Sequence, residues 1–329
     1  MKTQPLLSAA LFCAALFAAK AANAEIPQTE ALNRFIGQMV KQHHFNEADL
    51  KHLFQSVNIQ QAILDAMAKP AEGKPWQQYR EIFLTESRID GGVQFWRDNQ
   101  AALSAVERNS GVPAEIIVAI IGVETKYGAF TGKYRVMDAL STLGFAYPSR
   151  SEFFLKELEN FLLLSREEHL DPLQPMGSYA GAMGLTQFMP SSYRAYARDF
   201  DHDNKRDIWH NPSDAIASVA NYFVANHWQR GGAIAYRVSA KGQGYKSALT
   251  KGVKPDMPLG RLRKLGIQVP AKLADKEQVK LLSYPFSDHE ELWLGLHNFY
   301  VITRYNHSPL YAMAAYQLSR AIREKKAQN

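Results

Sequence analysis

The feature that most constrains this chain is its longest apolar run beyond the N-terminal segment, which ends directly at a carboxylate. Ile116 to Val123 are almost all apolar, Pro113 stands near a first helical position, and Glu124 follows. Periodicity alone does not separate helix from strand here, but the Ala and Gly content favours a buried helix that ends near Gly128. A carboxyl packed against such an apolar surface loses hydration, which raises its pKa. A Glu that faces solvent at the end of its helix is the alternative.

Length and composition describe an ordinary globular protein of about two domains. The 329 residues are 46% hydrophobic and 21% charged, which excludes a wholly disordered, collagenous or coiled-coil chain. The single Cys, Cys13, excludes a disulfide scaffold.

The first 24 residues have the pattern of a secretory signal peptide. Lys2 precedes an apolar run from Leu6 to Phe17, and Ala22-Asn23-Ala24 fits the small-x-small cleavage pattern. The run is too short for a transmembrane helix. Cys13 does not fit a lipid-attachment motif, because Phe12 precedes it where that motif has a small residue. We therefore expect a soluble periplasmic protein, cleaved after Ala24, with no lipid anchor indicated.

Cleavage would remove two lysines and lower the formal charge from +6 to +4. That charge is too small over this length to imply a nucleic-acid partner, although a mild affinity for an anionic polymer stays open. The mature chain would hold no Cys, which excludes thiol catalysis and cysteine metal sites.

Apolar periodicity predicts a mainly helical chain. Asn46 is expected to cap a helix that carries Leu50 and Phe54. The pair Gly91-Gly92 indicates either a close approach of two elements or a helix break. The expected helical segments are residues 32–40, 46–54, 76–109 (two or three helices), 151–166, 214–228 and 311–325.

The residues from Ala233 to Trp293 differ in composition from the preceding helical segments and predict a small β-rich insertion. Gly and Pro residues punctuate this stretch. The segments with β-prone residues are 234–238, 279–284 and 291–303.

A glycine- and alanine-rich string from Ser178 to Tyr193 is the second candidate for chemistry. Its small residues let backbone approach a ligand closely, and Gln187 is suited to hydrogen bonding with an amide or a sugar hydroxyl. Close helix packing, which also needs small residues, is the alternative.

An acidic loop is the third candidate. Asp199, Asp201 and Asp203 stand at positions one, three and five of a calcium-loop pattern, and Lys205 stands at position seven, which normally offers its carbonyl. Position twelve is not a Glu, and Asp214 is the acid that follows. A solvated acidic turn is the alternative, but bare acids at this density repel one another, so we expect Ca²⁺.

The fourth candidate is an aromatic and amide-rich stretch from Asn298 to Ser308, followed by Tyr311. Such residues suit stacking on sugar faces, although buried core tyrosines are the commoner outcome. A Ser-His-Asp order, a phosphate loop and a zinc motif are all absent from the sequence.

Together these stretches resemble the membrane-bound lytic transglycosylase B family of bacterial cell-wall enzymes. The resemblance runs from about Phe35 to the C-terminus. Its motifs are Gly-Val-Glu-Thr, Gly-Ala-Met-Gly-x-x-Gln-Phe-Met-Pro-Ser-Ser-Tyr and Thr-Arg-Tyr-Asn-His-Ser, in that order.

The resemblance implies a mainly α (α+β) protein with a lysozyme-like catalytic core. The core would span residues 111–232, completed by 294–307, and would contain the calcium loop. A helical domain would span 25–110, completed by 308–325, and a small β-rich domain 233–293.

The resemblance also implies the site residues. Glu124 matches the family's single acid/base, and the calcium ligands would be Asp199, Asp201, Asp203, Lys205 and Asp214. The spacing to Asp214 is one residue longer than in one known member of the family, and that member has a pair of arginines where this chain has only Arg150. The implied substrate contacts are Ser178, Gln187, Tyr222, Tyr305, Asn306, Tyr311 and Arg150.

The implied reaction cleaves the β-1,4 bond between N-acetylmuramic acid and N-acetylglucosamine and leaves a 1,6-anhydro end. No second acid stands beside Glu124 in these motifs, which fits a route assisted by the substrate's acetamido group. The implied partners are peptidoglycan strands and other cell-wall enzymes, with no organic cofactor. A hydrolytic muramidase and a non-catalytic peptidoglycan-binding scaffold are the alternatives.

Overall fold

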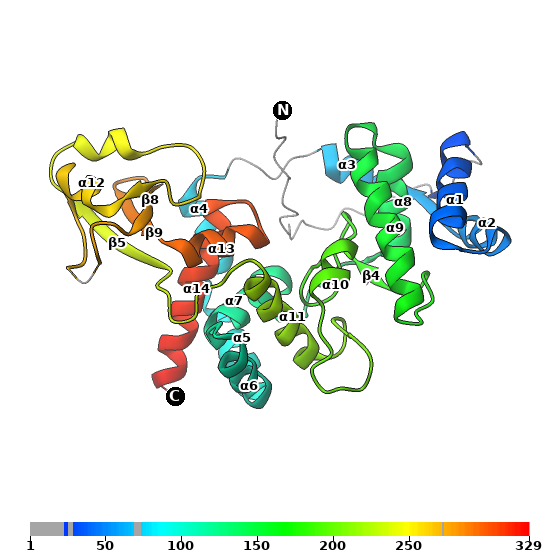
Figure 1. Cartoon of the computed structure of the whole chain (residues 1–329), viewed down its shortest axis with the longest axis horizontal. Coiled ribbons are helices and arrows are strands. Elements are labelled where there is room, and N and C mark those ends of the chain that lie inside the picture. Colours follow the sequence, from blue (N-terminus) through cyan, green and yellow to red (C-terminus); the bar gives the residue numbers. More distant parts are fainter. Residues whose placement is uncertain (1–22, 26–28, 69–73, 272, 329) are drawn as a thin grey trace. The chain divides into compact units, whose positions relative to one another are not determined.

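The computed structural model describes residues 23–25, 29–68, 74–271 and 273–328, which form two compact units (Figure 1). Within the described residues, the first unit combines 74–127 with 219–328, and the second combines 23–68 with 128–218. The predicted signal peptide lies outside the described residues except for Asn23 and Ala24. Over the described ranges, no helix has both the length and the apolar character needed to cross a membrane.

The first unit is a set of helices with a small sheet. Its helices are α4 (Trp76–Phe83), α5 (Glu86–Asp98), α6 (Gln100–Ser110), α7 (Ala114–Thr125), α12 (Leu259–Lys264), α13 (His297–Tyr305) and α14 (Pro309–Gln328). Its strands are β5 (Ala235–Ala240), β6 (Met257–Pro258), β7 (Ile267–Gln268), β8 (Gln278–Pro285) and β9 (Glu290–Gly295), and a 3₁₀ turn spans Gly244–Ala248. Helix α11 (Pro212–Ala225) begins in the second unit and ends in the first.

Helix α7 is the buried helix of the first unit, as its apolar run predicts. Every residue from Ala114 to Thr125 except Glu115 is buried, and the helix packs against α5, α6 and α14. It ends where Lys126 adopts a left-handed conformation, with φ of 50°. A helix that is apolar all round needs neighbours on every side, which places the end of α7, with Glu124, inside the unit.

The predicted β-rich stretch forms one five-stranded antiparallel sheet in the order β6-β8-β9-β5-β7. Its core includes Leu281 and Leu294 from the central strands. The prediction of β structure over 291–303 is right as far as Gly295 and wrong beyond it, because His297–Tyr305 is helix α13. There Phe299, Val301 and Ile302 are buried, so burial on a helix outweighs their β propensity.

The second unit is helical with two short two-stranded ladders. Its helices are α1 (Glu30–His43), α2 (Glu47–Gln55), α3 (Gln61–Ala68), α8 (Val136–Ala146), α9 (Ser151–Glu167) and α10 (Pro190–Tyr196), with a 3₁₀ turn at Pro148–Arg150. Strand β1 (Asn23–Glu25) pairs with β2 (Asn58–Gln60), and β3 (Tyr134–Arg135) pairs with β4 (Met176–Gly177).

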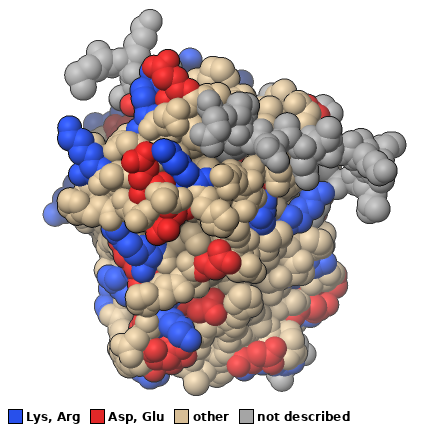
Figure 2. All heavy atoms as spheres, turned by 90° about the vertical axis from the view of Figure 1, so that its right-hand side faces the viewer, with Lys and Arg blue, Asp and Glu red and all other residues tan. Residues whose placement is uncertain are grey.

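Asn46 caps α2 as predicted. Its side-chain oxygen accepts the N–H groups of Ala48, at 2.8 Å, and Asp49, at 3.1 Å. The core of this unit is built where α8 packs against α9, and α10 also packs against α9. The face drawn in Figure 2 carries acidic and basic side chains interspersed with one another.

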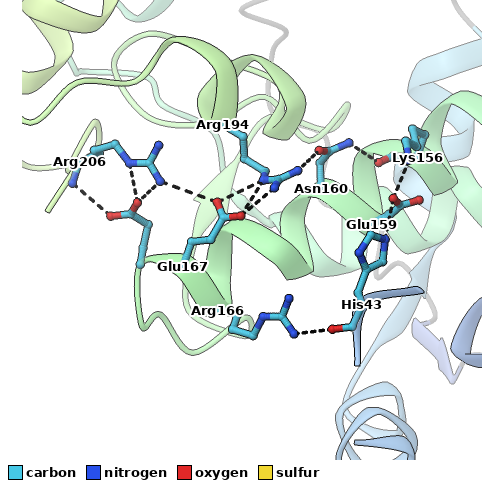
Figure 3. Close-up of polar contacts among 9 residues, drawn as sticks. His43, Lys156, Glu159, Asn160, Arg166, Glu167, Arg194 and Arg206 are labelled. Atoms are coloured by element: carbon cyan, nitrogen blue, oxygen red, sulfur yellow. Dashed lines mark hydrogen bonds and ion pairs between the residues drawn. The ribbon is translucent and has the colours of Figure 1, made fainter. Parts of the chain in front are cut away.

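A polar network runs along α9 and connects it to the acidic loop (Figure 3). Arg206, which follows Lys205 on that loop, donates to Glu168 at 2.6 Å, and its guanidinium also lies 3.8 Å from Glu167. Glu167 in turn accepts from Arg194 of α10 at 2.7 Å. At the other end of α9, Glu159 contacts His43 of α1 at 3.0 Å. The network therefore ties three helices and the loop together.

Gly91 and Gly92 mark a close approach and not a break, since both lie inside helix α5. A Cβ atom on Gly92 would stand 2.6 Å from the hydroxyl oxygen of Tyr127, and one on Gly122 would stand 2.5 Å from the same atom. The hydroxyl of Tyr127 donates to the carbonyl of Arg88 at 2.8 Å. The tyrosine thus fills a slot between α5 and α7 that only glycines leave open.

We expect Gly122→Ala to lower the free energy of unfolding by about 1–3 kcal/mol, because the methyl group collides with the Tyr127 ring. Gly37→Ala on α1 is the matched control, since a Cβ there has nothing within 4 Å. The control should raise stability by about 0.5–1 kcal/mol through helix propensity. Urea unfolding of both variants measures the difference. Equal stabilisation by the two substitutions would show that the slot is not tight.

Candidate active site

The carboxyl of Glu124 lies buried at the end of α7, with 5% of the residue exposed. Its Oε1 atom accepts a hydrogen bond of 2.6 Å from the hydroxyl of Tyr311, which lies near the start of α14. The first unit therefore brings together two predicted site residues that are 187 positions apart in the sequence.

Burial raises the pKa of Glu124 from 4.5 to about 8, and the hydrogen bond from Tyr311 offsets only part of that shift. The last turn of α7 acts in the same direction as burial, because the negative end of a helix dipole disfavours an anion. A carboxyl that keeps its proton at neutral pH can donate it to a leaving oxygen.

Three tyrosines lie close enough to this carboxyl to interact with it electrostatically, and we call Tyr79, Tyr305 and Tyr311 the tyrosine cluster. Burial is the main cause that raises the pKa of each of the three hydroxyls, and the nearby Glu124 raises it further. The cluster therefore stays protonated and able to donate hydrogen bonds across the neutral range. Sequence reasoning missed Tyr79, because it sits in an ordinary helical segment, α4, with no motif around it.

The backbone beside Glu124 is held by a buried arginine. The guanidinium of Arg88 donates to the carbonyl of Gly122, two residues before Glu124, and lies 5.3 Å from the ring centre of Phe83. The carbonyl of Gly122 also accepts the N–H of Lys126 at 3.1 Å, so the Arg88 contact adds a second hydrogen bond at the end of α7.

Tyr222 and Asn306 also belong to the first unit. The ring of Tyr222 lies 4.7 Å from that of Tyr305, and its hydroxyl donates to the carbonyl of Arg304. Asn306 is buried, and its side-chain oxygen accepts no hydrogen bond from any residue that the structure describes. A buried polar atom without a partner is costly, so this oxygen has the capacity to accept a hydrogen bond from a bound molecule.

Ser178 and Gln187 lie in the second unit, on the predicted glycine-rich loop. The hydroxyl oxygen of Ser178 accepts the N–H groups of Ala180 and Ala182, at 3.3 and 3.0 Å. The side-chain nitrogen of Gln187 donates to the carbonyls of Gly184 and Thr131, at 2.8 and 3.1 Å. Both side chains therefore shape the loop on which they sit.

Gly184 shows why that loop needs glycine. Its φ is 62°, and a Cβ there would stand 2.4 Å from the carbonyl oxygen of Ile208.

Arg150, the other predicted substrate contact of this unit, places its guanidinium 4.4 Å from the ring centre of Phe153.

The predicted metal ligands Asp199, Asp201 and Asp203 converge in the second unit. Each offers one carboxylate oxygen, and these atoms lie within 4.8 Å of one another. Asp199 also accepts the N–H groups of His202, at 2.7 Å, and Asn204, at 2.9 Å. Asn204 has a φ of 66°, the left-handed conformation expected where a calcium loop usually has Gly.

Asp214 is fully buried and uses both carboxylate oxygens on the backbone of the same loop. One accepts the N–H of Phe200 at 2.8 Å and the other the N–H of Asp207 at 2.9 Å. Lys205 lies on the loop, and its N–H donates to Asp203 at 2.8 Å. The oxygen-only donor set of the three converging aspartates suits a hard cation.

Comparison with known proteins decides the family. A family model described as the transglycosylase SLT domain matches residues 27–320. The chain belongs to the SLT transglycosylase family. It is 43% identical over 299 residues to membrane-bound lytic murein transglycosylase B of Escherichia coli strain K12, covering 88% of this chain and 81% of the relative.

Solved structures agree with this assignment. Soluble lytic transglycosylase SltB1 from Pseudomonas aeruginosa matches with a TM-score of 0.87 and 50% identity, covering 90% of this chain and 99% of SltB1. The fold is thus the mainly helical, lysozyme-like fold of lytic transglycosylases, with a small sheet, as predicted. This transglycosylase is an enzyme that acts on murein.

Two related structures carry ligands. The E. coli lytic transglycosylase Slt35 was solved in complex with calcium, with a TM-score of 0.86, 40% identity and coverage of 94% and 97% of the two chains. P. aeruginosa SltB3 was solved in complex with NAG-NAM-pentapeptide, with a TM-score of 0.80, 31% identity and coverage of 90% and 80%.

The raised pKa of Glu124 predicts how stability depends on pH in this transglycosylase. Between pH 4.5 and about 8 the folded state keeps a proton that the unfolded state loses, so the free energy of unfolding falls as pH rises. Glu124→Gln has no such proton. The melting temperature of Glu124→Gln, measured relative to that of the wild type, should therefore rise between pH 5 and pH 8.

Calorimetry at the two pH values measures this gain. Glu81→Gln, which removes an exposed carboxylate from α4, is the control for loss of charge. A constant difference between Glu124→Gln and the wild type across the range would mean that the carboxyl titrates alike in the folded and unfolded states.

Proposed function

We propose that Glu124 is the single acid and base of the lytic transglycosylase reaction in this chain. The observation that carries the proposal is the burial of this carboxyl at the end of α7, which raises its pKa to about 8 and so favours the protonated form at neutral pH. Protonated Glu124 gives its proton to the glycosidic oxygen between N-acetylmuramic acid and N-acetylglucosamine. The bond from that oxygen to C1 of the muramic residue then breaks.

The substrate's own groups complete the reaction. The 2-acetamido group stabilises the oxocarbenium-like centre at C1, and the Glu124 carboxylate then takes the proton of the C6 hydroxyl. The C6 oxygen bonds to C1, which gives the 1,6-anhydro end and regenerates protonated Glu124 without consuming water. Because the hydroxyl is tethered to the reacting sugar, its effective concentration exceeds that of solvent water.

The tyrosine cluster supports Glu124 in both steps. Tyr311 donates its hydrogen bond to the carboxylate more strongly than to the neutral acid, so it eases the release of the proton.

The buried side-chain oxygen of Asn306 is a proposed acceptor for a substrate N–H or hydroxyl. Tyr222 holds Tyr305 through its ring contact.

Ser178, Gln187 and Arg150 are proposed substrate contacts of the second unit. The Ser178 hydroxyl oxygen accepts backbone groups, which leaves its proton to donate to a sugar oxygen. Gln187 keeps its side-chain oxygen for an acetamido N–H, because its nitrogen serves the loop. Arg150 offers a cation to a peptide carboxylate.

We propose that the enzyme acts on peptidoglycan strands in the periplasm after cleavage behind Ala24. The support is the charge, apolar and cleavage pattern of residues 1–24. A partnership with other cell-wall enzymes remains an expectation of the family resemblance. Product analysis distinguishes this function from the two alternatives, a hydrolytic muramidase and a non-catalytic scaffold.

Calcium is the proposed structural ion of the acidic loop. Its ligands would be carboxylate oxygens of Asp199, Asp201 and Asp203 and the carbonyl of Lys205. Asp214 would join them if one of its carboxylate oxygens bound the ion while still accepting its backbone N–H group. The guanidinium of Arg206, on the same loop, pairs with Glu168.

We expect Glu124→Gln to lower the turnover of purified sacculi by at least ~10²–10⁴, the usual value of general acid–base help. Glu115→Gln is the control, since Glu115 lies on the same helix but pairs with Arg323 at 3.1 Å. Mass spectrometry of the released muropeptides should show 1,6-anhydro ends for the wild type and for the control. Ends that incorporate ¹⁸O from labelled water would make the enzyme a hydrolase.

We also expect calcium to raise the melting temperature, because an ion that binds only the folded state stabilises it. The missing Glu at position twelve points to a dissociation constant of ~10⁻⁴–10⁻³ M. Asp201→Ala should abolish the response to millimolar calcium, whereas Asp65→Ala, on exposed α3 surface of the same unit, should keep it. Identical melting in calcium and in chelator would leave the loop a solvated acidic turn.

A further inference from the structure

One short segment of the small sheet region carries the equivalent of the whole chain's net charge. Residues 241–264 hold seven basic side chains and one acidic side chain, a net charge of +6. The entire chain has 38 basic and 32 acidic side chains, which is also +6. The remaining residues therefore hold 31 of each sign. We call this segment the basic strap.

The fold turns those charges outward. The strap runs beside β5, β8 and β9 (Figure 1, yellow) and includes the 3₁₀ turn, β6 and α12. Its apolar side chains are buried in the core of the sheet region with Leu281 and Leu294. The buried residues of the strap are Tyr245, Ala248, Met257, Leu259 and Leu262.

The strap's only acidic side chain is paired with a buried lysine. Asp256 contacts the ammonium of Lys280 at 2.7 Å, and that ammonium, 1% exposed, comes from β8. Lys280 also donates to Thr250 and to the carbonyl of Lys251, at 3.2 Å in the latter case. This network fixes the strap and leaves its surface without a free anion of its own.

Most of the strap's cations remain available. Arg263 pairs with Asp275 at 2.7 Å, and Lys246 lies close enough to Glu290 to lower the pKa of that carboxyl, whose largest influence is its hydrogen bond from Ser283. Across the described residues, five cations of the strap have no side-chain ion pair or hydrogen bond: Lys241, Lys251, Lys254, Arg261 and Lys264. By contrast, the face in Figure 2 mixes both signs.

We propose that the basic strap binds the free carboxylates of peptidoglycan peptides and so anchors the enzyme on its polymer. The inference rests on the proposed function, which makes a peptide-bearing glycan the substrate. An array of exposed cations attracts a polyanion over a distance of about a Debye length, and it does not need a shaped pocket. It therefore holds the enzyme near the wall between successive cleavages.

The chemistry of the strap favours this polymer over an anionic membrane surface. Binding at a bilayer surface normally adds apolar or aromatic side chains that enter the lipid. The large hydrophobic residues exposed on the described surface are Phe130, Leu170, Met176 and Val224, and all of them lie outside the strap. The apolar side of α12 faces the core of the sheet region instead.

The test is cosedimentation with insoluble sacculi in the background of Glu124→Gln, so that the polymer stays intact. The test variant replaces Lys254, Arg261 and Lys264 with Gln. The control replaces Lys41, Arg97 and Arg108, three exposed cations outside the strap, in the same way. Since both variants lose the same charge, only the position of the cations differs.

We expect the strap variant to weaken binding at low salt on the order of tenfold and to flatten its salt dependence, with less than about a twofold change in the control. Sacculi whose carboxylates have been converted to amides should bind the parent as weakly as native sacculi bind the strap variant. Equal loss in both variants, or unchanged binding to amidated sacculi, overturns the proposal. Strap-dependent binding to vesicles containing phosphatidylglycerol, without strap-dependent binding to sacculi, overturns it as well.

Failure of the strap and failure of the proposed function are distinguishable. The proposed function fails if the wild type releases no 1,6-anhydro products or if Glu124→Gln still cleaves the sacculi. The strap fails if the two triple variants bind alike, whatever the products are.

Discussion

The buried carboxyl of Glu124 is the interaction on which the rest of the site depends. A carboxyl removed from water favours its neutral form, and here the hydrogen bond from Tyr311 offsets burial only in part. The same burial is unfavourable whenever the group ionises, so the surrounding fold has to tolerate both states. Tyr311 does this, because its hydroxyl can donate to an anion without bringing a fixed positive charge that would keep Glu124 ionised.

The first unit is organised to hold that carboxyl in place. Helix α7 is apolar all round and is enclosed by α5, α6 and α14, so its end cannot move independently of them. Arg88 binds the carbonyl of Gly122, and Tyr127 fills the slot left by the glycines. The chain returns after the sheet region to supply Tyr305 and Tyr311, which explains why the site draws on both ends of the unit.

Much of this arrangement follows from the sequence. The apolar run before Glu124 predicts the buried helix and the raised pKa, and the alternate aspartates at 199, 201 and 203 predict a cluster of oxygen donors. What the sequence does not predict are contacts made in three dimensions. Tyr79 and Arg88 reach the site only through helix packing, and Arg206 turns from the acidic loop to Glu168. The helix over His297–Tyr305 is similar, since its β-prone residues follow the packing of the core.

The most direct measurement is the titration of Glu124 itself, followed by ¹³C NMR of protein labelled at the Glu side-chain carboxyl, with Glu124→Gln used to assign the signal. A signal that keeps the shift of a protonated carboxyl through pH 7 and titrates near pH 8 is the result predicted here. A signal that titrates near 4.5, like an exposed Glu, would contradict the account, because the group would then be a carboxylate at neutral pH and unable to act first as an acid.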